Sequence, residues 1–268
     1  VYKRQQWGLV DGEGLKIAKG IYLLPNLLTT AALFAGFSAV VAAMDGNFDR
    51  AGIAIFVAMV MDGLDGRVAR LTSTESDFGK EYDSLADMIS FGLAPALVVY
   101  QWGIVRLSEL GWLWGKLGWI TTFFYAVCAA LRLARYNTRT GKGDPRFFEG
   151  LPSPSAAALT AALVWRGTEL GLSGSAALIG GFLVTAIAGA LMVSNFPYYS
   201  GKDLNLTRRV KFAYVLIIPL IFMVISLNPP VVLFGLFFAY AMSGPALALA
   251  RRSGRQRRRE QARAAVDD

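Results

Sequence analysis

The chain contains no histidine and only one cysteine among its 268 residues. Without histidine, Ser-His and Cys-His nucleophile pairs are excluded, and so are most protein zinc sites. The single cysteine, Cys128, lies in an apolar run and has no second cysteine with which to form a disulfide inside the chain. Carboxylates, amides, hydroxyls and basic side chains are therefore the groups that could carry chemistry here.

Acidic residues are also scarce: the chain has 19 Asp and Glu against 27 Lys and Arg, whereas 54% of its residues are hydrophobic. This hydrophobic share exceeds that of a typical soluble domain. The apolar residues form runs of about 20, the length that a helix needs to cross a bilayer. The runs lie near 22–44, 51–71, 85–105, 112–134, 153–168, 174–194, 210–227 and 229–250. We expect an all-α fold, a polytopic transmembrane helical bundle of about eight spans, or of about six if the last pairs of runs are not separate spans.

The basic residues gather between these runs, in the N-terminal segment, near 135–146 and 200–211, and in the tail RRSGRQRRREQARAAVDD. An even number of spans puts all these segments on one side, which the excess of Lys and Arg identifies as cytoplasmic. The net charge of +8 therefore suits an anionic membrane surface, and we expect no nucleic-acid partner.

This pattern divides the chain into three regions. Residues 1–20 are expected to be a cytoplasmic juxtamembrane segment, in which the mixture of apolar and charged residues at 7–20 predicts an amphipathic helix at the interface. Residues 21–250 form the transmembrane domain, and residues 251–268 form a basic cytoplasmic tail. The first residues are polar and charged, which predicts no cleavable signal peptide.

The strongest chemical signal is a set of acids at the inner ends of the second and third runs, in MDGLDGRVARLTSTESDFGKEYDSLADMISFG. Asp62 and Asp65 are spaced i, i+3, and Asp83 and Asp87 are spaced i, i+4, so each pair projects from one face of a helix. Carboxylates that converge in this way repel one another unless cations lie among them, and an all-oxygen ligand set suits Mg²⁺ or Mn²⁺. Solvated surface acids are the alternative, but an unpaired carboxylate at the end of a membrane segment is costly.

The spacing of these residues resembles the signature of the CDP-alcohol phosphatidyltransferases, D-x2-D-G-x2-A-R-x8-G-x3-D-x3-D, at every fixed position. The resemblance implies an integral-membrane enzyme that displaces CMP from a CDP-linked lipid with an alcohol. Asp62, Asp65 and Asp83 are the expected metal ligands. The resemblance implies that Asp87 completes a site for two divalent ions and also acts as the base that takes the hydroxyl proton. It also implies a homodimer.

The segment PNLLT, which opens the first span, resembles the P-N-x2-T element that contacts the cytidine in this family. The two motif glycines would let the nucleotide approach the backbone closely, and close helix packing is the alternative reason for them. The motif arginine lies one turn beyond the first glycine, where it could bind a phosphate or pair with a motif acid. The expected CDP-lipid contacts are Asn26, Thr29, Gly66, Arg70 and Gly79.

Three further segments, ISFGLAPA, FFEGLPSPSAAA and MVSNFPYYSGK, are similar to bacterial type II phosphatidylserine synthases. This similarity implies CDP-diacylglycerol and L-serine as substrates, phosphatidylserine and CMP as products, and a site on the cytoplasmic side of the bacterial inner membrane. The serine carboxylate needs a cation or hydrogen-bond donors, although an arginine near the membrane edge could instead snorkel to the interface. The expected serine contacts are Arg132, Arg135 and Asn137, with Ser153, Ser155, Tyr198 and Lys202 ranked behind them.

Two other functions remain open from the sequence. Another family member would use glycerol 3-phosphate, inositol phosphate or a second lipid as its acceptor, and the basic loop after 134 could provide cations for a phosphorylated alcohol. A cation transporter would use the acids as an ion path. Transporter sites usually lie near the bilayer midplane, often in repeated halves, whereas these acids lie at one edge and the motif occurs once.

Overall fold

The computed structural model describes residues 14–72, 74, 76–139, 147–172, 174–200, 219–220 and 223–267. The helices are α1 (Gly14–Met44), α2 (Phe48–Thr72), α3 (Asp77–Asp87), α4 (Ala94–Trp102), α5 (Trp112–Arg139), α6 (Ser153–Glu169), α7 (Ser175–Val193) and α9 (Pro229–Asp267). A π-helical turn, η1 (Met88–Leu93), joins α3 to α4, and a 3₁₀ helix, η2 (Ile104–Leu110), precedes α5.

The expected all-α membrane bundle is confirmed. The described chain contains four helical segments that are long and apolar enough to cross a membrane, and one shorter apolar helix at Ala177–Val193. The four segments are Leu24–Met44, Asp77–Trp102, Trp112–Thr138 and Pro229–Ala250. The second and fifth expected spans form α2 and α6, but α2 carries the charges of the motif and α6 has only 17 residues. Most of the seventh expected span, 210–227, lies outside the described residues.

The predicted interfacial helix at 7–20 lies partly outside the described residues. From Gly14 onward the chain belongs to α1, which continues without a break through Pro25 into the first span. At the other end of the chain, α9 continues beyond the apolar segment through the basic tail to Asp267.

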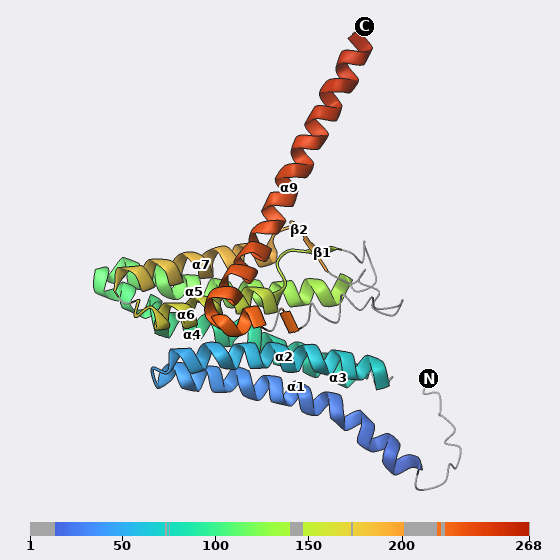
Figure 1. Cartoon of the computed structure of the whole chain (residues 1–268), viewed down its shortest axis with the longest axis vertical. Coiled ribbons are helices and arrows are strands. Elements are labelled where there is room, and N and C mark those ends of the chain that lie inside the picture. Colours follow the sequence, from blue (N-terminus) through green and yellow to red (C-terminus); the bar gives the residue numbers. More distant parts are fainter. Residues whose placement is uncertain are drawn as a thin grey trace, which may run out of the picture.

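Figure 1 shows α1 and α2 side by side along one edge of the bundle, with α5, α6 and α7 beyond them. Alanines at Ala35, Ala39 and Ala43 of α1 are buried in one core cluster together with Ala51 and Ala58 of α2. Small side chains let two helix backbones approach closely, which is how helices associate when the surrounding solvent is itself apolar. Helix α9 starts against α6 and then extends away from the bundle (Figure 1).

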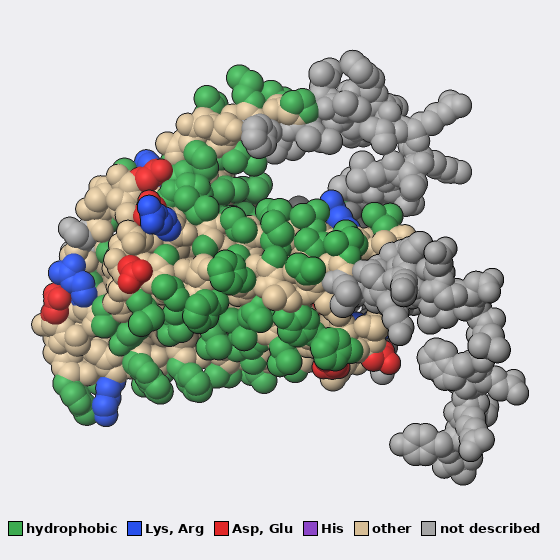
Figure 2. Space-filling model, turned by 90° about the horizontal axis from the view of Figure 1, so that it is seen from below, with side chains coloured by type: hydrophobic (Ala, Val, Ile, Leu, Met, Phe, Trp, Pro, Cys, Tyr) green, Lys and Arg blue, Asp and Glu red, His purple; other side chains and the backbone are tan. Residues whose placement is uncertain are grey.

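A band of hydrophobic side chains covers the face of the bundle shown in Figure 2, and charged side chains lie toward its two ends. Helix α3 takes part in this division, since Phe78 is 70% exposed and Leu85 65% exposed, while Asp83 and Asp87 are half-buried. An apolar surface of this extent is typical of contact with lipid hydrocarbon rather than water.

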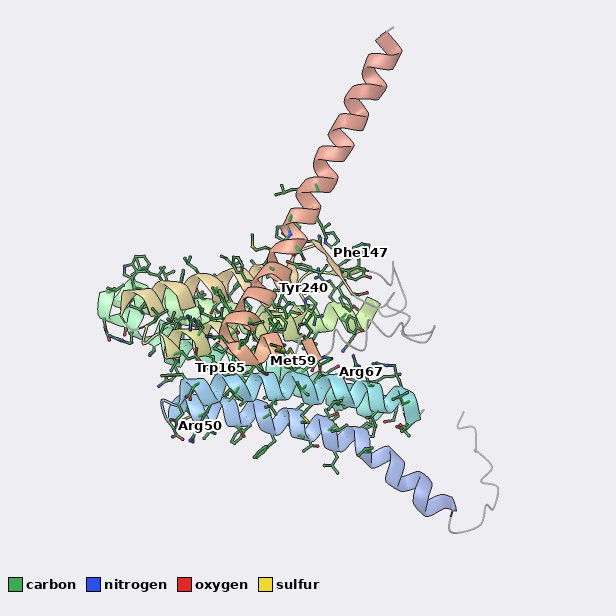
Figure 3. The ribbon with its side chains drawn as sticks, viewed as in Figure 1. Arg50, Met59, Arg67, Phe147, Trp165 and Tyr240 are labelled. Atoms are coloured by element: carbon green, nitrogen blue, oxygen red, sulfur yellow. The ribbon has the colours of Figure 1, made fainter. Side chains whose placement is uncertain are left out.

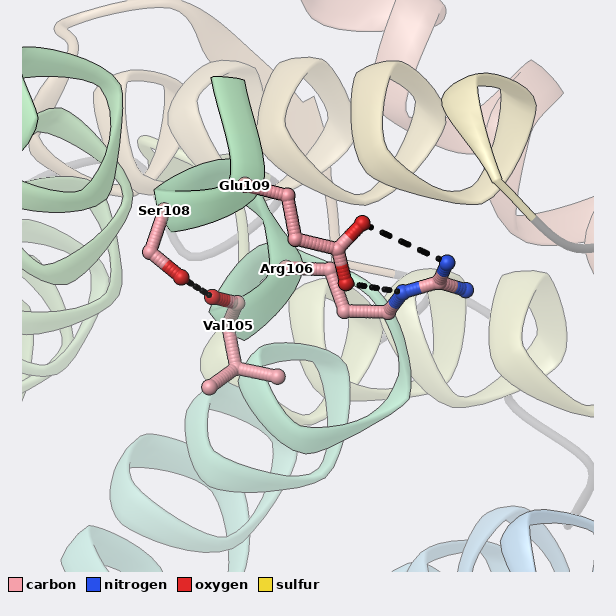
Figure 4. Close-up of polar contacts among 4 residues, drawn as sticks. All are labelled: Val105, Arg106, Ser108 and Glu109. Atoms are coloured by element: carbon pink, nitrogen blue, oxygen red, sulfur yellow. Dashed lines mark hydrogen bonds and ion pairs between the residues drawn. The ribbon is translucent and has the colours of Figure 1, made fainter. Parts of the chain in front are cut away.

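The two ends of the bundle differ in construction. At one end, η2 is held by local contacts: Arg106 Nε donates to Glu109 Oε1 at 3.0 Å, and the Ser108 hydroxyl donates to the Val105 carbonyl at 2.9 Å (Figure 4). At the other end lies a small antiparallel sheet of β1 (Phe147–Glu149) and β2 (Pro197–Tyr199). This sheet joins the FFEG and NFPYY segments, which lie about 50 residues apart in the sequence.

Candidate active site

Three of the motif acids come together where α2 and α3 face each other. Carboxylate oxygens of Asp62, Asp83 and Asp87 all lie within 4.8 Å of one another. The carboxyl groups of Asp62 and Asp87 are close enough for a side-chain hydrogen bond. Asp62 belongs to the C-terminal half of α2, which also carries Arg67. Arg50 lies near the other end of this helix (Figure 3). Three partly buried carboxyl groups at this separation repel one another unless protons or cations are shared among them.

The fourth acid, Asp65, has a different environment. Its side chain is 4% exposed, and its Oδ2 accepts a hydrogen bond from the Thr29 hydroxyl at 2.7 Å. Asp65 is not one of the three acids whose oxygens lie within 4.8 Å of one another. The structure therefore groups three of the four expected metal ligands and ties the fourth to the first span through Thr29.

The chemistry of the cluster fits a hard divalent cation. Asp83 Oδ1 is buried and has no hydrogen-bond partner among the described residues. A buried carboxylate oxygen without a donor is unfavourable, and nearly all such oxygens in folded proteins have a partner. A cation bound among these acids would supply that partner, and the donor set consists of oxygen alone, as Mg²⁺, Mn²⁺ and Ca²⁺ prefer.

The expected nucleotide contacts on α1 lie beside the start of α3. Ser76 caps α3 by accepting a hydrogen bond from the Gly79 backbone N–H at 3.0 Å. A Cβ atom added at Gly79 would lie 3.1 Å from the Ser76 hydroxyl and 3.4 Å from Asn26 Oδ1. The Thr30 hydroxyl and the Tyr82 hydroxyl are hydrogen-bonded at 2.9 Å. The PNLLT element and the acid motif therefore meet directly, with Gly79 at the contact.

Gly66 has open space around it. A Cβ atom added there would meet only the Arg70 guanidinium, with Nη1 3.5 Å away. Among the residues that the structure describes, no closely packed neighbouring helix therefore accounts for this glycine. The Arg70 side chain is exposed and its charge acts on Asp65. Gly66 thus leaves a small free volume beside the exposed Arg70 guanidinium, close to Asp65.

Arg132 points into the bundle rather than toward the interface. Its side chain is 8% exposed, and its Nη1 donates to the Ser153 hydroxyl at 2.6 Å. Its charge acts on Asp87, and its guanidinium lies 5.9 Å from the ring centre of Tyr136. A snorkelling arginine would place its head group in water. The buried guanidinium of Arg132 therefore does not snorkel to the interface.

The other two expected serine contacts are engaged by the protein itself. The Arg135 guanidinium donates to the backbone carbonyls of Glu149, Met192, Val193 and Ser194 and to Asn195 Oδ1, at 2.8 to 3.2 Å. It therefore caps the C-terminal end of α7 and ties it to β1. Asn137 Nδ2 donates to the Ser84 hydroxyl at 3.0 Å, which joins the end of α5 to α3 beside Asp83.

The lower-ranked candidates also differ in position. Ser153 is fully buried as the partner of Arg132, and the Tyr198 hydroxyl donates to the Ala241 carbonyl at 2.9 Å. Lys202 lies outside the described residues. The sequence did not point to Tyr240 of α9 (Figure 3). Its hydroxyl donates to the Tyr199 carbonyl at 3.0 Å, and it interacts electrostatically with Arg132. No spacing rule connects α9 to α5, so no local signal pointed to it.

Known proteins resemble this chain over most of its length, including the segments that carry the acid cluster. The sequence model of the CDP-alcohol phosphatidyltransferase family matches residues 22–194. A CDP-diacylglycerol–serine O-phosphatidyltransferase of Helicobacter pylori is 36% identical over 224 residues, which cover 83% of this chain and 90% of that protein. A protein of the same name from Mycobacterium tuberculosis is 40% identical over 142 residues, 51% of this chain and 47% of that protein. An archaetidylserine synthase of Methanothermobacter thermautotrophicus is 35% identical over 177 residues, 65% of this chain and 69% of that protein.

Proposed function

Because the chain belongs to the CDP-alcohol phosphatidyltransferase family, we propose that it transfers the phosphatidyl group of CDP-diacylglycerol to the hydroxyl of L-serine, releasing CMP. The observation that carries the proposal is the position of Arg132, a buried cation whose charge acts on an acid of the Asp62–Asp83–Asp87 cluster. Serine carries its hydroxyl and its carboxylate on neighbouring carbons. A base and a cation close together are therefore suited to hold both groups at once.

We propose that Asp62, Asp65, Asp83 and Asp87 hold two divalent cations, Mg²⁺ or Mn²⁺. The support is the oxygen-only cluster and the unpartnered Asp83 oxygen. When bound, such ions neutralise the pyrophosphate and stabilise the entering and leaving oxygens. In this proposal Thr29 fixes the rotamer of Asp65, since its hydroxyl already donates to that carboxylate.

The CDP-lipid lies, in this proposal, between Asn26, twelve residues into α1, and the two motif glycines. Asn26, beside Gly79, is in position to bond the cytosine ring, and the open space at Gly66 leaves room for a phosphate next to the backbone. Arg70 is exposed and free to turn toward that phosphate, for which a guanidinium fork is well suited.

The transfer itself is a displacement at phosphorus. Asp87 takes the proton of the serine hydroxyl, the serine oxygen bonds to the lipid-linked phosphorus, and the bond from that phosphorus to CMP breaks. Arg132 holds the serine carboxylate, with Ser153 fixing its guanidinium. Arg135 and Asn137 act indirectly, by holding the end of α7 and the end of α5 around the acceptor.

The basic segments also bear on the membrane orientation of the enzyme. We propose that the site faces the cytoplasm from the bacterial inner membrane, supported by the basic segments that flank it. A homodimer remains a prediction from the family resemblance.

The direct test uses purified enzyme with CDP-diacylglycerol, Mn²⁺ and one candidate alcohol at a time, with CMP release as the readout. We expect serine to support the fastest release, and Asp83→Asn protein to release none with any alcohol. A preference for glycerol 3-phosphate or inositol phosphate would remove the serine assignment and leave the phosphatidyltransferase assignment standing. Serine-dependent release that requires no divalent ion would contradict the metal site.

A further inference from the structure

The helix that carries Asp83 and Asp87 changes its winding immediately after Asp87. Residues Met88–Leu93 form the π-helical turn η1, and the Ala94 N–H donates to the Ile89 carbonyl five residues earlier. Pro95 follows and has no N–H, so it cannot donate to the Phe91 carbonyl, which an α-helix would require of it. π-turns are rare in helices and need support from neighbouring elements.

Tyr125 of α5 supplies that support from outside the helix. Its hydroxyl donates to the Phe91 carbonyl at 3.3 Å, and both side chains are fully buried. The hydroxyl also lies within hydrogen-bond reach of Thr160 on α6. A tyrosine hydroxyl buried in an apolar bundle is costly unless it is bonded, so this contact fixes where α5 lies along η1.

The contact is one of several between α5 and the continuous helical segment formed by α3 and η1. Tyr125, Ala129 and Arg132 follow an i, i+4, i+7 pattern and so share one face of α5. Tyr125 meets the Phe91 carbonyl, and the Ala129 Cβ lies 3.3 Å from where a Cβ on Gly92 would stand. Two turns from Tyr125, the charge of Arg132 acts on Asp87.

The opposite side of η1 is fixed against α1. The Ser90 hydroxyl donates to the Ala32 carbonyl at 3.1 Å. A Cβ atom on Gly36 would lie only 2.6 Å from that hydroxyl, so the two elements are in close contact. With α1 on one side and α5 on the other, η1 has little freedom to rotate or to slide.

We propose that Tyr125 is a positioning residue that sets the register between the metal-binding acids on α3 and the acceptor-binding arginine on α5. The charge of Arg132 acts on its hydroxyl, but the described hydrogen bonds and ion pairs join Tyr125 neither to Arg132 nor to the acids, and it acts through the Phe91 carbonyl. The inference rests on the proposed function of the acid cluster and of Arg132. Without the Tyr125 hydroxyl, η1 keeps its packing against Ala129 and α1 but loses its hydrogen bond to α5, and Asp83 and Asp87 shift relative to Asp62 on α2.

The test is Tyr125→Phe, which removes one oxygen, with Tyr100→Phe on α4 as the matched control. Binding of Mn²⁺ alone to the purified, full-length protein is followed by the EPR signal of the free ion, with no acceptor alcohol present. We expect the half-saturating Mn²⁺ concentration to rise on the order of tenfold in Tyr125→Phe, as for loss of one buried hydrogen bond, and to stay unchanged in Tyr100→Phe. The Mn²⁺ concentration for half-maximal CMP release should rise by a similar factor.

A second variant separates positioning from simple stability. Pro95→Ala restores an N–H that can donate to the Phe91 carbonyl, so Tyr125→Phe should raise the half-saturating Mn²⁺ concentration less in that background. Folded Tyr125→Phe protein that binds Mn²⁺ as tightly as wild type would overturn the proposal, whatever its melting temperature. Wild-type protein that binds no Mn²⁺ would remove the metal site and this inference together, whereas a different acceptor alcohol would leave this inference intact.

Discussion

Asp87 is close to both a second acid and a cation. Its carboxyl group contacts Asp62, and the charge of Arg132 acts on it. A base at this position could take a proton from an alcohol held between the two charged groups. The charge of Arg132 acts on Asp62 as well, so what separates the two acids in the proposed mechanism is the proton-accepting role of Asp87.

The proposed role of Asp87 as the base predicts separate phenotypes for Asp87 and Asp62. Asp87→Asn should lower the rate of CMP release by roughly 10² or more, since positioned proton transfer contributes about that much. It should retain more CDP-lipid binding than Asp62→Asn or Asp65→Asn does, as measured by titration with a CDP-diacylglycerol analogue. Equal loss of binding in all three variants would make Asp87 a metal ligand only.

The two arginines of α5 offer a second comparison at this scale. Arg132→Ala should raise the KM for serine by about ten- to hundred-fold, the loss expected for a charge-assisted hydrogen bond, with little change in the KM for CDP-diacylglycerol. Arg135→Ala should instead lower the melting temperature, because its partners are the backbone carbonyls at the end of α7. Arg132→Lys should restore little if the carboxylate is bound by both arms of the guanidinium. A normal serine KM in Arg132→Ala would move the acceptor pocket elsewhere.

At the scale of elements, α2 must be a stable helix and also leave room for the substrate. Gly63 and Gly66 both lie inside it, where glycine is destabilising relative to alanine by roughly 0.5–1 kcal/mol. A Cβ on Gly63 would meet nothing within 4 Å, and a Cβ on Gly66 would meet only the flexible end of Arg70. No packing contact with a described residue requires either glycine.

Alanine at the two positions should therefore have the same effect on stability, but only alanine at position 66 should affect function. Both Gly63→Ala and Gly66→Ala should raise the free energy of unfolding by roughly 0.5–1 kcal/mol. Only Gly66→Ala should raise the KM for CDP-diacylglycerol, because its new methyl group occupies the space proposed for a phosphate. Thermal unfolding and CMP-release kinetics on the two proteins decide the matter, and a normal KM in Gly66→Ala would place the nucleotide elsewhere.

Features that depend on local periodicity within one element could be predicted from the sequence, whereas contacts between distant elements could not. Helical spacing places Asp83 and Asp87 on one face of α3, and the apolar runs give the positions of α1, α4, α5 and α7, because both depend on local periodicity. The pairing of β1 with β2, the capping role of Arg135 and the bond from Arg132 to Ser153 join segments far apart in the chain. No periodicity contains that information. The π-turn at η1 was missed because its support comes from Tyr125 on another helix.

At the scale of the whole molecule, the acid cluster joins α2 to α3, and the hydrogen bond from Thr29 to Asp65 joins α1 to α2. Cation binding should therefore stabilise the protein as a unit. Mn²⁺ at about 100 times its dissociation constant should add about 2.7 kcal/mol per bound ion to the free energy of unfolding, and a chelator should remove this gain. Melting curves in detergent with and without Mn²⁺ measure it.

Asp83→Asn is the matched control for this experiment. The amide keeps the size of the side chain and removes its charge, so Mn²⁺ should no longer raise the melting temperature. Without any ion, this variant should melt no lower than wild type, because a repulsion with Asp62 has been removed. An equal rise with Mn²⁺ in both proteins would locate the stabilising ion away from the cluster.

Helix α3 has acids on its inner side and exposed Phe78 and Leu85 on its outer side. One substrate thus reaches the site by diffusing in two dimensions within the bilayer, and the other arrives from bulk water. The velocity should therefore follow the mole fraction of CDP-diacylglycerol in the membrane rather than its molar concentration. Adding inert phospholipid at a constant total amount of CDP-diacylglycerol dilutes the lipid substrate at the surface and slows the reaction, while the half-saturating concentration of the water-soluble substrate stays the same.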